Sequence, residues 1–370
     1  MSKIRKLYFK DINSLRFIAY LPIFLFVCLY LLRTKKDGSI NLLSDLFLNL
    51  SLNSIDFYFF ISAFLLTSLA LREYKYKHNF SLKKFYIRKA LRIFPLLIIA
   101  LIFALFFHSY IIKILQLTNI NKNSALYYLI GIPNFMSNIQ PERFVYTVII
   151  FSIYMMLQFY FIWGLVLKFL KNQLVLISVI FIVFGVIVRL ILINKSIVFY
   201  FNPLSYGVSI GVGGLLAYII REKQSFIDNI KKLSRTKILT VYTLGSLLVL
   251  VLYIYLINNV LTAFIPLITV PFYAFVITEQ TFCKKSVVKF RKFKIFNRLG
   301  RISYGLILLT PIVATTLNIA FESIDKGLES NLFKIIFVFA TFVASWFIAD
   351  VSYNSYEKIF RYVRRDFKRI

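Results

Sequence analysis

Long apolar runs alternate with short polar segments along almost the whole chain. Ten of these runs are close to the ~20 residues that an α-helix needs to cross the ~30 Å hydrocarbon core of a bilayer. The pattern therefore predicts ten transmembrane helices, near residues 14–33, 55–71, 93–112, 147–167, 173–194, 198–220, 238–257, 261–280, 302–320 and 333–352.

One further apolar stretch, residues 125–137, is short and contains Gly131 and Pro133. Irregular backbone at membrane depth occurs where protein or a water-filled cavity surrounds it. We predict a re-entrant or interfacial segment there, with an eleventh crossing as the alternative.

Basic residues are distributed unevenly between the connecting segments. Every second segment is rich in Lys and Arg, and these segments together hold 34 of the 45 basic residues: 1–13, 72–92, 168–171, 221–237, 284–301 and 358–369. Because cytoplasmic loops carry the excess of Lys and Arg, this asymmetry predicts that both termini are cytoplasmic. A full crossing at 125–137 would place the later basic segments on the opposite side. We therefore expect an all-α, polytopic membrane protein.

The composition supports this class and excludes others. The chain is 59% hydrophobic and carries a net charge of +30, a combination that a soluble core could not accommodate. The basic residues flank spans and form no recognisable nucleic-acid motif, so we expect no nucleic-acid partner. Cys28 in the first span and Cys283 in a cytoplasmic segment are too far apart in this topology to pair. No appended soluble domain is evident, which predicts one membrane domain over residues 1–370.

Ionisable residues inside spans are costly and therefore informative. Arg16 lies near the inner end of the first span, where it either extends to the headgroups or has a functional role. Asp56 begins the predicted second span and is expected to cap its N-terminus. Arg189, near the outer end of the span 173–194, is expected to extend to the membrane surface.

Common catalytic constellations are sparse. The only histidines are His78 and His108, and no cysteine cluster replaces them, so we expect no metal site. A histidine general base would have to be one of these two. Phosphate-binding loops, dinucleotide fingerprints and serine-hydrolase elbows are not found.

The segment from Arg72 to Pro95 carries a more specific signal. Arg88 and Arg92 lie four residues apart, on one helical face just before a span. Paired guanidinium groups can bind a polyphosphate, such as that of coenzyme A, through bidentate hydrogen bonds. The alternative is that they anchor the topology and contact lipid headgroups.

Three stretches share motifs with a known family. Asp56–Leu65 resembles D-x-F-F-x-x-S-G-F-L, Ser81–Pro95 resembles S-x-x-x-F-Y-x-R-R-x-x-R-I-x-P, and Leu299–Leu306 resembles L-G-x-I-S-Y-x-L. In this order they resemble the acyltransferase-3 family, integral-membrane O-acyltransferases that modify surface glycans and other polar acceptors. The resemblance implies acyl-CoA as a co-substrate, and we assign Arg88, Arg92 and Ser62 to its binding.

The mechanism that the resemblance implies uses an Arg and a His in the first helix, with acyl-CoA entering from the cytoplasmic side. Arg16 matches the Arg of L-R-x-x-A, but the His position is Val27. Phe151–Tyr160 resembles W-S-L-x-x-E-x-Q-F-Y, and its acid falls on Met156. A His that often follows Y-x-L-x-L falls on Thr310.

Valine and methionine cannot transfer protons, which excludes a His-based acyl transfer through these positions. Retained activity needs a substitute group, for which Arg16, Cys28 and His108 are the candidates. Cys28 lies one residue past the His position, about 100° around the helix. His108 is expected near the outer face of the membrane.

We expect a multi-pass protein of the bacterial inner (cytoplasmic) membrane that transfers an acyl group from acyl-CoA to a cell-envelope glycan. A first alternative is a catalytically inactive relative that binds acyl-CoA or a lipid-linked glycan, or scaffolds polysaccharide biosynthesis proteins. A second alternative is a glycan polymerase or flippase. In each case the lipid bilayer is the expected environment.

Overall fold

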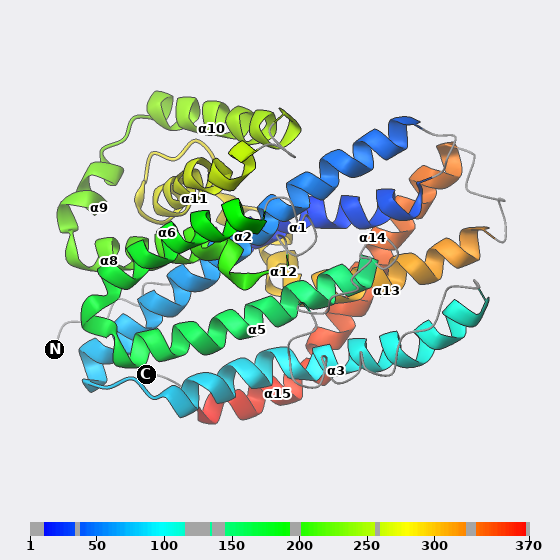
Figure 1. Ribbon diagram of the computed structural model, residues 1–370, viewed down its shortest axis with the longest axis horizontal. Helices are drawn as coiled ribbons and strands as arrows, with labels where there is room; N and C mark the ends of the chain where they lie inside the picture. The colour runs from blue at the N-terminus through cyan, green and yellow to red at the C-terminus, as the bar shows by residue number, and fades with distance from the viewer. Residues whose placement is uncertain are drawn as a thin grey trace.

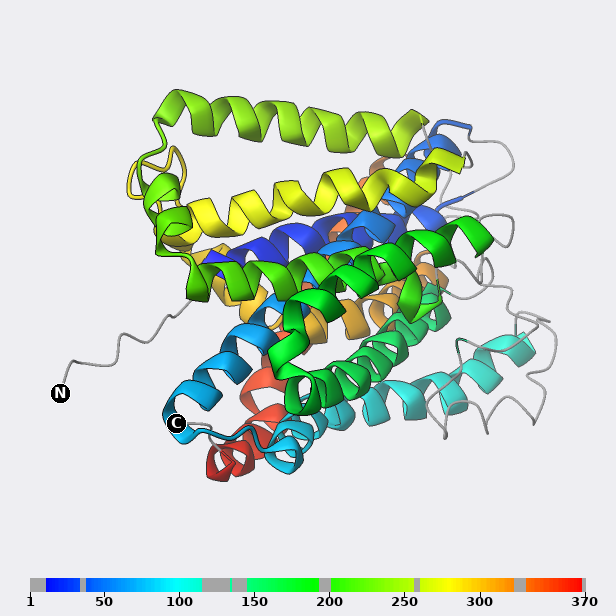
Figure 2. The ribbon, with the colours of Figure 1, turned by 60° about the vertical axis from the view of Figure 1, so that its left-hand side comes forward.

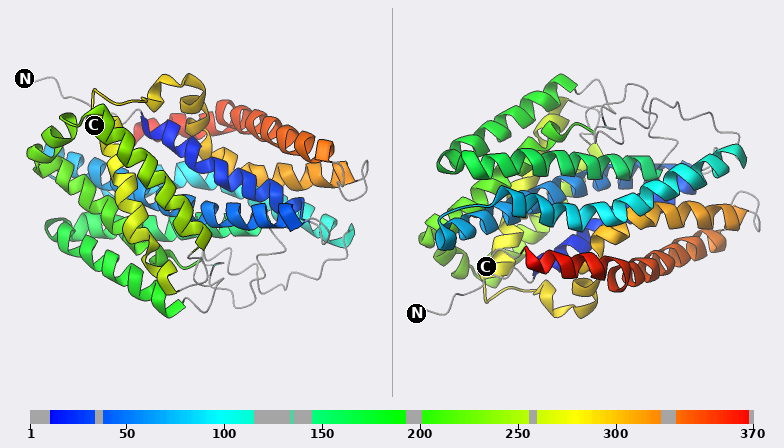
Figure 3. Two further views of the ribbon diagram at one scale, coloured as in Figure 1. Left: turned by 90° about the horizontal axis from the view of Figure 1, so that it is seen from above. Right: turned by 90° about the horizontal axis from the view of Figure 1, so that it is seen from below.

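The helices of the protein run along a common direction and form one bundle (Figures 1 and 3). This computed structural model describes residues 11–33, 38–114, 134, 145–192, 201–255, 260–322 and 331–367, and every regular element among them is helical. The long helices are α1 (Asp11–Leu31), α2 (Gly38–Lys77), α3 (Leu82–Ile114), α5 (Val145–Phe169), α6 (Leu174–Leu192), α8 (Gly207–Glu222), α10 (Arg235–Tyr255), α11 (Ile265–Phe282), α13 (Ser303–Glu322) and α14 (Asn331–Asn354).

Shorter helices connect or extend the long ones. Three of them are α-helical, namely α9 (Gln224–Lys231), α12 (Lys294–Arg301) and α15 (Tyr356–Asp366). The 3₁₀ turns are η3 (Lys171–Gln173), η4 (Pro203–Tyr206), η5 (Val260–Phe264) and η6 (Phe290–Lys292).

The prediction of an all-α, polytopic membrane protein is confirmed. Within the described residues, nine helices are long and apolar enough to cross a membrane. The remaining predicted span, 93–112, lies within α3. The segment 125–137 lies outside the described residues except for Asn134, which is buried and donates a hydrogen bond of 2.9 Å to the carbonyl of Phe201.

The second helix is much longer than the predicted span 55–71. It extends from Gly38 to Lys77, which is 40 residues. Polar residues lower the hydropathy of its first half, so a hydropathy window does not detect this part. The structure supplies partners for them: Tyr273 donates a hydrogen bond to Asn53, and Asn49 donates one of 3.4 Å to the carbonyl of Tyr253. Tertiary contacts with α10 and α11 therefore extend the helix beyond its apolar stretch.

A buried ion pair joins α2 to α6. The Arg189 Nη2 atom lies 2.9 Å from Asp56 Oδ2, and the two side chains are only 6% and 2% exposed. Ser209 on α8 donates a hydrogen bond of 2.5 Å to Asp56, while Arg189 Nε donates one of 2.6 Å to the carbonyl of Ser205. Asp56 is thus a mid-helix residue and not an N-cap, and Arg189 points into the bundle and not to the membrane surface. Both expectations were wrong because the helix start was placed too late and the partner across the bundle could not be identified.

Helix α8 packs closely against two neighbours because glycines lie on two of its faces. A side chain at Gly211 would collide with the Ser178 carbonyl on α6, and one at Gly213 would collide with the Phe60 carbonyl on α2. Small residues at such positions let helix backbones approach closely, which drives association in a lipid environment.

The basic connecting segments gather at one end of the bundle. Figure 2 shows the α2–α3 turn, α9, and α15 together at its left-hand end. Specific contacts tie the segments there: the Arg291 amide donates to Asp11 Oδ1 at 2.9 Å, and Arg88 Nη1 donates to the Phe367 carbonyl at 2.7 Å. This arrangement agrees with the topology deduced from the charges, with the start of α1 and the end of α15 on one side.

The topology predicts where single cysteines are labelled by a membrane-impermeant maleimide in a bacterial host. K84C and K292C should both be labelled only after the membrane is permeabilised, whereas G38C, at the far end of α2, should be labelled in intact cells. Gly38 is exposed and has open space around it, so this substitution is sterically neutral. Labelling of K84C and K292C from opposite sides would overturn the topology.

Removal of one partner from the Asp56–Arg189 pair should strongly destabilise the fold. We expect R189M to lower the free energy of unfolding by about 3–5 kcal/mol, because it leaves a buried carboxylate without its counter-charge. Thermal stability of the detergent-solubilised protein measures the effect. The matched control is R298M, whose ion pair with Asp350 is exposed and should contribute little. Equal losses in both variants would contradict a special role for the buried pair.

Candidate functional site

Arg88, Lys89 and Arg92 are three of the five basic residues in the first three turns of α3, at the end of the bundle where the basic segments gather. Arg88 lies against α2 and α15: its Nη2 atom is 3.9 Å from Glu73 Oε2, and its Nη1 atom donates to the Phe367 carbonyl. Burial lowers the pKa of Arg88, and Glu73 opposes this shift. Arg88 therefore holds the start of α3 in place, and its predicted contact with acyl-CoA stays a prediction.

Arg92, one helical turn further on, has a different environment. Its side chain is exposed, and it lies within electrostatic range of Arg16 on α1 and of Glu357 and Arg364 on α15. Among the described residues, none receives a hydrogen bond from its guanidinium group. Arg92 is thus available to an anionic ligand at a place where several positive charges meet.

Arg16 projects toward the same place from α1. Tyr58 on α2 donates a hydrogen bond of 2.6 Å to the Arg16 carbonyl, and Tyr160 on α5 lies close enough to interact with the Arg16 charge. The Arg16 side chain is half-buried inside the bundle. The structure therefore brings Arg16 together with Arg92, although the two were predicted from unrelated motifs.

Ser62 joins this group through Tyr160. The Ser62 and Tyr160 hydroxyls are 3.3 Å apart, and the Lys89 ammonium lies 3.9 Å from the centre of the Tyr160 ring. A cation over an aromatic face is stabilised by the ring quadrupole. We call Arg16, Ser62, Lys89, Arg92 and Tyr160, together with Glu357 and Arg364, the basic site.

The last two members belong to α15, which the sequence motifs did not single out. Burial raises the pKa of the Glu357 carboxyl, against the effect of Arg361, Arg92 and Arg364. Burial also lowers the pKa of Arg364, and Arg92 adds to that shift. The spacing of Glu357, Arg361 and Arg364 along one helical face could have indicated a shared site, but after a last span these charges were interpreted as topology signals.

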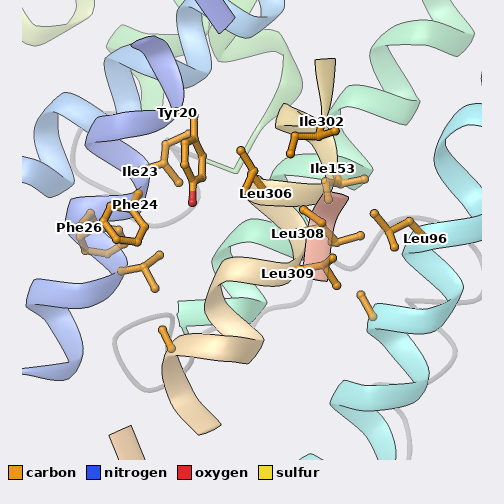
Figure 4. Packing of buried hydrophobic residues seen from close by; sticks show 14 of the residues in the cluster. Tyr20, Ile23, Phe24, Phe26, Leu96, Ile153, Ile302, Leu306, Leu308 and Leu309 are labelled. Atoms are coloured by element: carbon orange, nitrogen blue, oxygen red, sulfur yellow. The ribbon is translucent and has the colours of Figure 1, made fainter. Parts of the chain in front are cut away.

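The positions at which the family carries proton-transferring groups have apolar or hydroxyl side chains. Val27 has no exposed surface and lies in a core cluster with Phe24, Leu306 and Leu309. Figure 4 shows how these three residues pack with others of the cluster. Met156 is half-buried against a second cluster. Thr310 is buried, and its hydroxyl is 2.6 Å from that of Tyr20.

The two other catalytic candidates, Cys28 and His108, stay predictions. Cys28 has no exposed surface and lies in the same apolar cluster as Val27. His108 belongs to α3, but its side chain lies outside the described residues. Within the described ranges, no three His, Cys, Asp or Glu side chains are grouped so that they could hold a metal ion.

The basic site adjoins the apolar cluster that contains Val27. Tyr58, Tyr160 and Tyr304 are half-buried and pack against this cluster, while their hydroxyl groups face polar partners. A ligand with an anionic end and an apolar end matches this change of environment. Its charged groups suit Arg16 and Arg92, and its apolar part suits the tyrosine rings.

Comparisons with known proteins agree with the motifs. An acyltransferase-3 family model, described as an acyltransferase domain, matches residues 9–350. No curated protein and no solved structure matches the chain.

The position of Arg16 depends on close packing between α1 and α12. A side chain at Gly300 would collide with the Asn13 carbonyl on α1, whereas one at Gly305 would have its nearest neighbour, Ala349, at 3.5 Å. We expect G300A to lower the free energy of unfolding by about 1–3 kcal/mol, as overpacking does, and G305A to have little effect. Thermal denaturation of the two variants in detergent is the measurement. Equal stability of G300A and G305A would contradict this account.

Proposed function

We propose that this chain, which belongs to the acyltransferase-3 family, binds acyl-CoA at the basic site and transfers the acyl group, for example acetyl, to a cell-envelope glycan. The protein would act as one membrane domain in the bacterial cytoplasmic membrane. The observation that carries the proposal is the meeting of Arg16, Arg92 and Arg364 at the cytoplasmic end.

The charges of the basic site favour a polyanionic ligand. Arg16 and Arg364 each lie near Arg92, and like charges at short range repel. Glu357 is the acid that interacts with Arg92 among the described residues. A polyphosphate placed between the guanidinium groups would replace this repulsion by charge-assisted hydrogen bonds. Coenzyme A offers such a group, and it is present in the cytoplasm.

The transfer itself exchanges one bond for another. The carbon–sulfur bond of the thioester breaks, the acyl carbon bonds to a glycan hydroxyl oxygen, and the hydroxyl proton ends on the thiol of coenzyme A. The family's proton acceptor is replaced by Val27 here, so this chain needs a different group for that step. Arg16, Cys28 and His108 stay the predicted candidates, although the burial of Cys28 disfavours a reactive thiolate.

A second candidate function is supported by the packing around Val27. A fully buried valine among aromatic and aliphatic side chains leaves no proton acceptor at the family's catalytic position. A catalytically silent relative would still bind acyl-CoA or a lipid-linked glycan and could assist polysaccharide biosynthesis proteins. It predicts ligand binding without consumption of the thioester.

The acyl content of surface polysaccharide tests the catalytic proposal. A strain that lacks the gene should lose ester-linked acyl groups, and the wild-type gene should restore them. The R88Q/R92Q variant should fail to restore them, because it removes both guanidinium forks. The control K83Q/K84Q removes the same charge from exposed positions of the same helix and should restore acylation.

Binding and turnover of the purified full-length protein separate the two candidates. An acyl-CoA that binds and is consumed supports transfer, whereas one that binds and remains intact supports the silent relative. If R88Q/R92Q binds coenzyme A as wild type does, the arginine pair is only an anchor. A wild-type protein that does not bind coenzyme A would overturn the assignment of the donor.

A further inference from the structure

Helix α15 lies beyond the part of the chain that the family model matches. The match ends at residue 350, and α15 extends from Tyr356 to Asp366. After α14 the chain turns and α15 runs alongside the first half of α3 (Figures 1 and 3). The contact between Arg88 Nη1 and the Phe367 carbonyl fixes the end of α15 against α3.

Arg364 on α15 lies within electrostatic range of Arg92 on α3. The Arg92 charge contributes to lowering the pKa of Arg364, after burial, and Arg364 is half-buried. Within the described part of the chain, neither side chain makes a hydrogen bond to protein. Two like charges brought together in this way, neither of them hydrogen-bonded to a described residue, indicate a place for an anion from outside the chain.

Glu357 interacts with the same arginines from one side. Its carboxylate accepts a hydrogen bond of 3.4 Å from Ser352 and interacts with Arg92, Arg361 and Arg364. Arg361 has other partners, since its Nη2 atom donates to the Tyr353 carbonyl at 2.6 Å and its guanidinium lies 3.5 Å from the Tyr353 ring centre. Glu357 therefore compensates part of the positive charge and leaves Arg92 and Arg364 the most available cations.

We propose that α15 completes the donor site. Arg364 and Arg92 together bind the phosphate groups of coenzyme A, and the Glu357 carboxylate competes with these phosphates for the two arginines. This inference rests on the proposed function, because it extends the basic site to a helix outside the family match. Arg364 is thus a specificity-determining residue for polyphosphate donors, and α15 is a part of the substrate-binding surface.

The geometry explains why two helices are used. Arg92 on α3 and Arg364 on α15 approach from separate elements, so their planar forks can bind different oxygens of one polyphosphate. Two arginines on a single helix at i,i+4 spacing project side by side and can contact only one side of the ligand. Arg88, the other arginine of α3, is already held by Glu73 and Phe367.

Coenzyme A binding by the full-length protein in phosphatidylcholine nanodiscs tests the proposal. R364Q should weaken binding by about tenfold or more, as loss of a charge-assisted hydrogen bond does. E357Q should tighten it, because the competing carboxylate is removed. K358Q is the matched control, since it removes one exposed charge from the same helix and should leave binding unchanged. Pantetheine, which lacks the polyphosphate, should bind R364Q and wild type alike.

The outcomes distinguish this inference from the proposed function. If R92Q weakens binding but R364Q equals K358Q, α15 does not contact the donor and the inference is overturned while the donor site remains. Weakening by R364Q only in nanodiscs that contain phosphatidylglycerol would assign Arg364 to lipid headgroups and also overturn it. Failure of wild type to bind coenzyme A would overturn both.

Discussion

A bilayer tolerates few charges within a bundle, and the Asp56–Arg189 ion pair, with Ser209, joins three helices of this one. Each ion would be costly alone in a medium of low dielectric constant, so both have to be paired and hydrogen-bonded. Ser209 and the Ser205 carbonyl supply the remaining hydrogen bonds. The pair therefore sets how α2, α6 and α8 meet, and the glycines of α8 allow their backbones to approach to that distance.

The end of the bundle where the basic segments gather has the opposite character. Arginines near a membrane surface can extend to water and headgroups, so they need no full compensation by protein. Arg92 is exposed and Arg364 is half-buried there, whereas the cluster around Val27 is buried and apolar. The protein thus keeps the charged side chains of the basic site apart from the apolar cluster around Val27. The tyrosines Tyr58, Tyr160 and Tyr304 lie at the boundary, since each offers a ring to the cluster and a hydroxyl to the polar side.

The sequence alone predicted the class of fold well because lipid imposes it. Apolar length and the distribution of Lys and Arg depend on the bilayer and not on the partners of each helix, so each predicted span overlaps a long helix within the described residues. The first half of α2 was missed because its polar residues lower the hydropathy there, and partners on other helices, such as Tyr273 for Asn53, cannot be identified from the local sequence. The partner of Asp56 was missed for the same reason.

The candidate site could be predicted only in part. Arg16, Ser62, Arg88 and Arg92 were identified from motifs, and the structure brings Arg16, Ser62 and Arg92 together. Tertiary contacts decide which arginine is bound by other parts of the protein, however, and it is Arg88 that contacts Glu73 and the Phe367 carbonyl. Helix α15 follows the last span and matches no motif, so the charges along one of its faces did not indicate that Arg364 approaches Arg92.

The length of α2 has a consequence for how the chain can vary. A helix of 40 residues extends about 60 Å at 1.5 Å per residue, and it carries Asp56, Ser62 and Glu73 in a fixed angular phase. One inserted residue between Asp56 and Glu73 would turn the second by about 100° relative to the first. The helix could then keep either the Asp56–Arg189 ion pair or the contact between Glu73 and Arg88, but not both. We therefore expect this stretch of α2 to tolerate substitutions better than insertions or deletions.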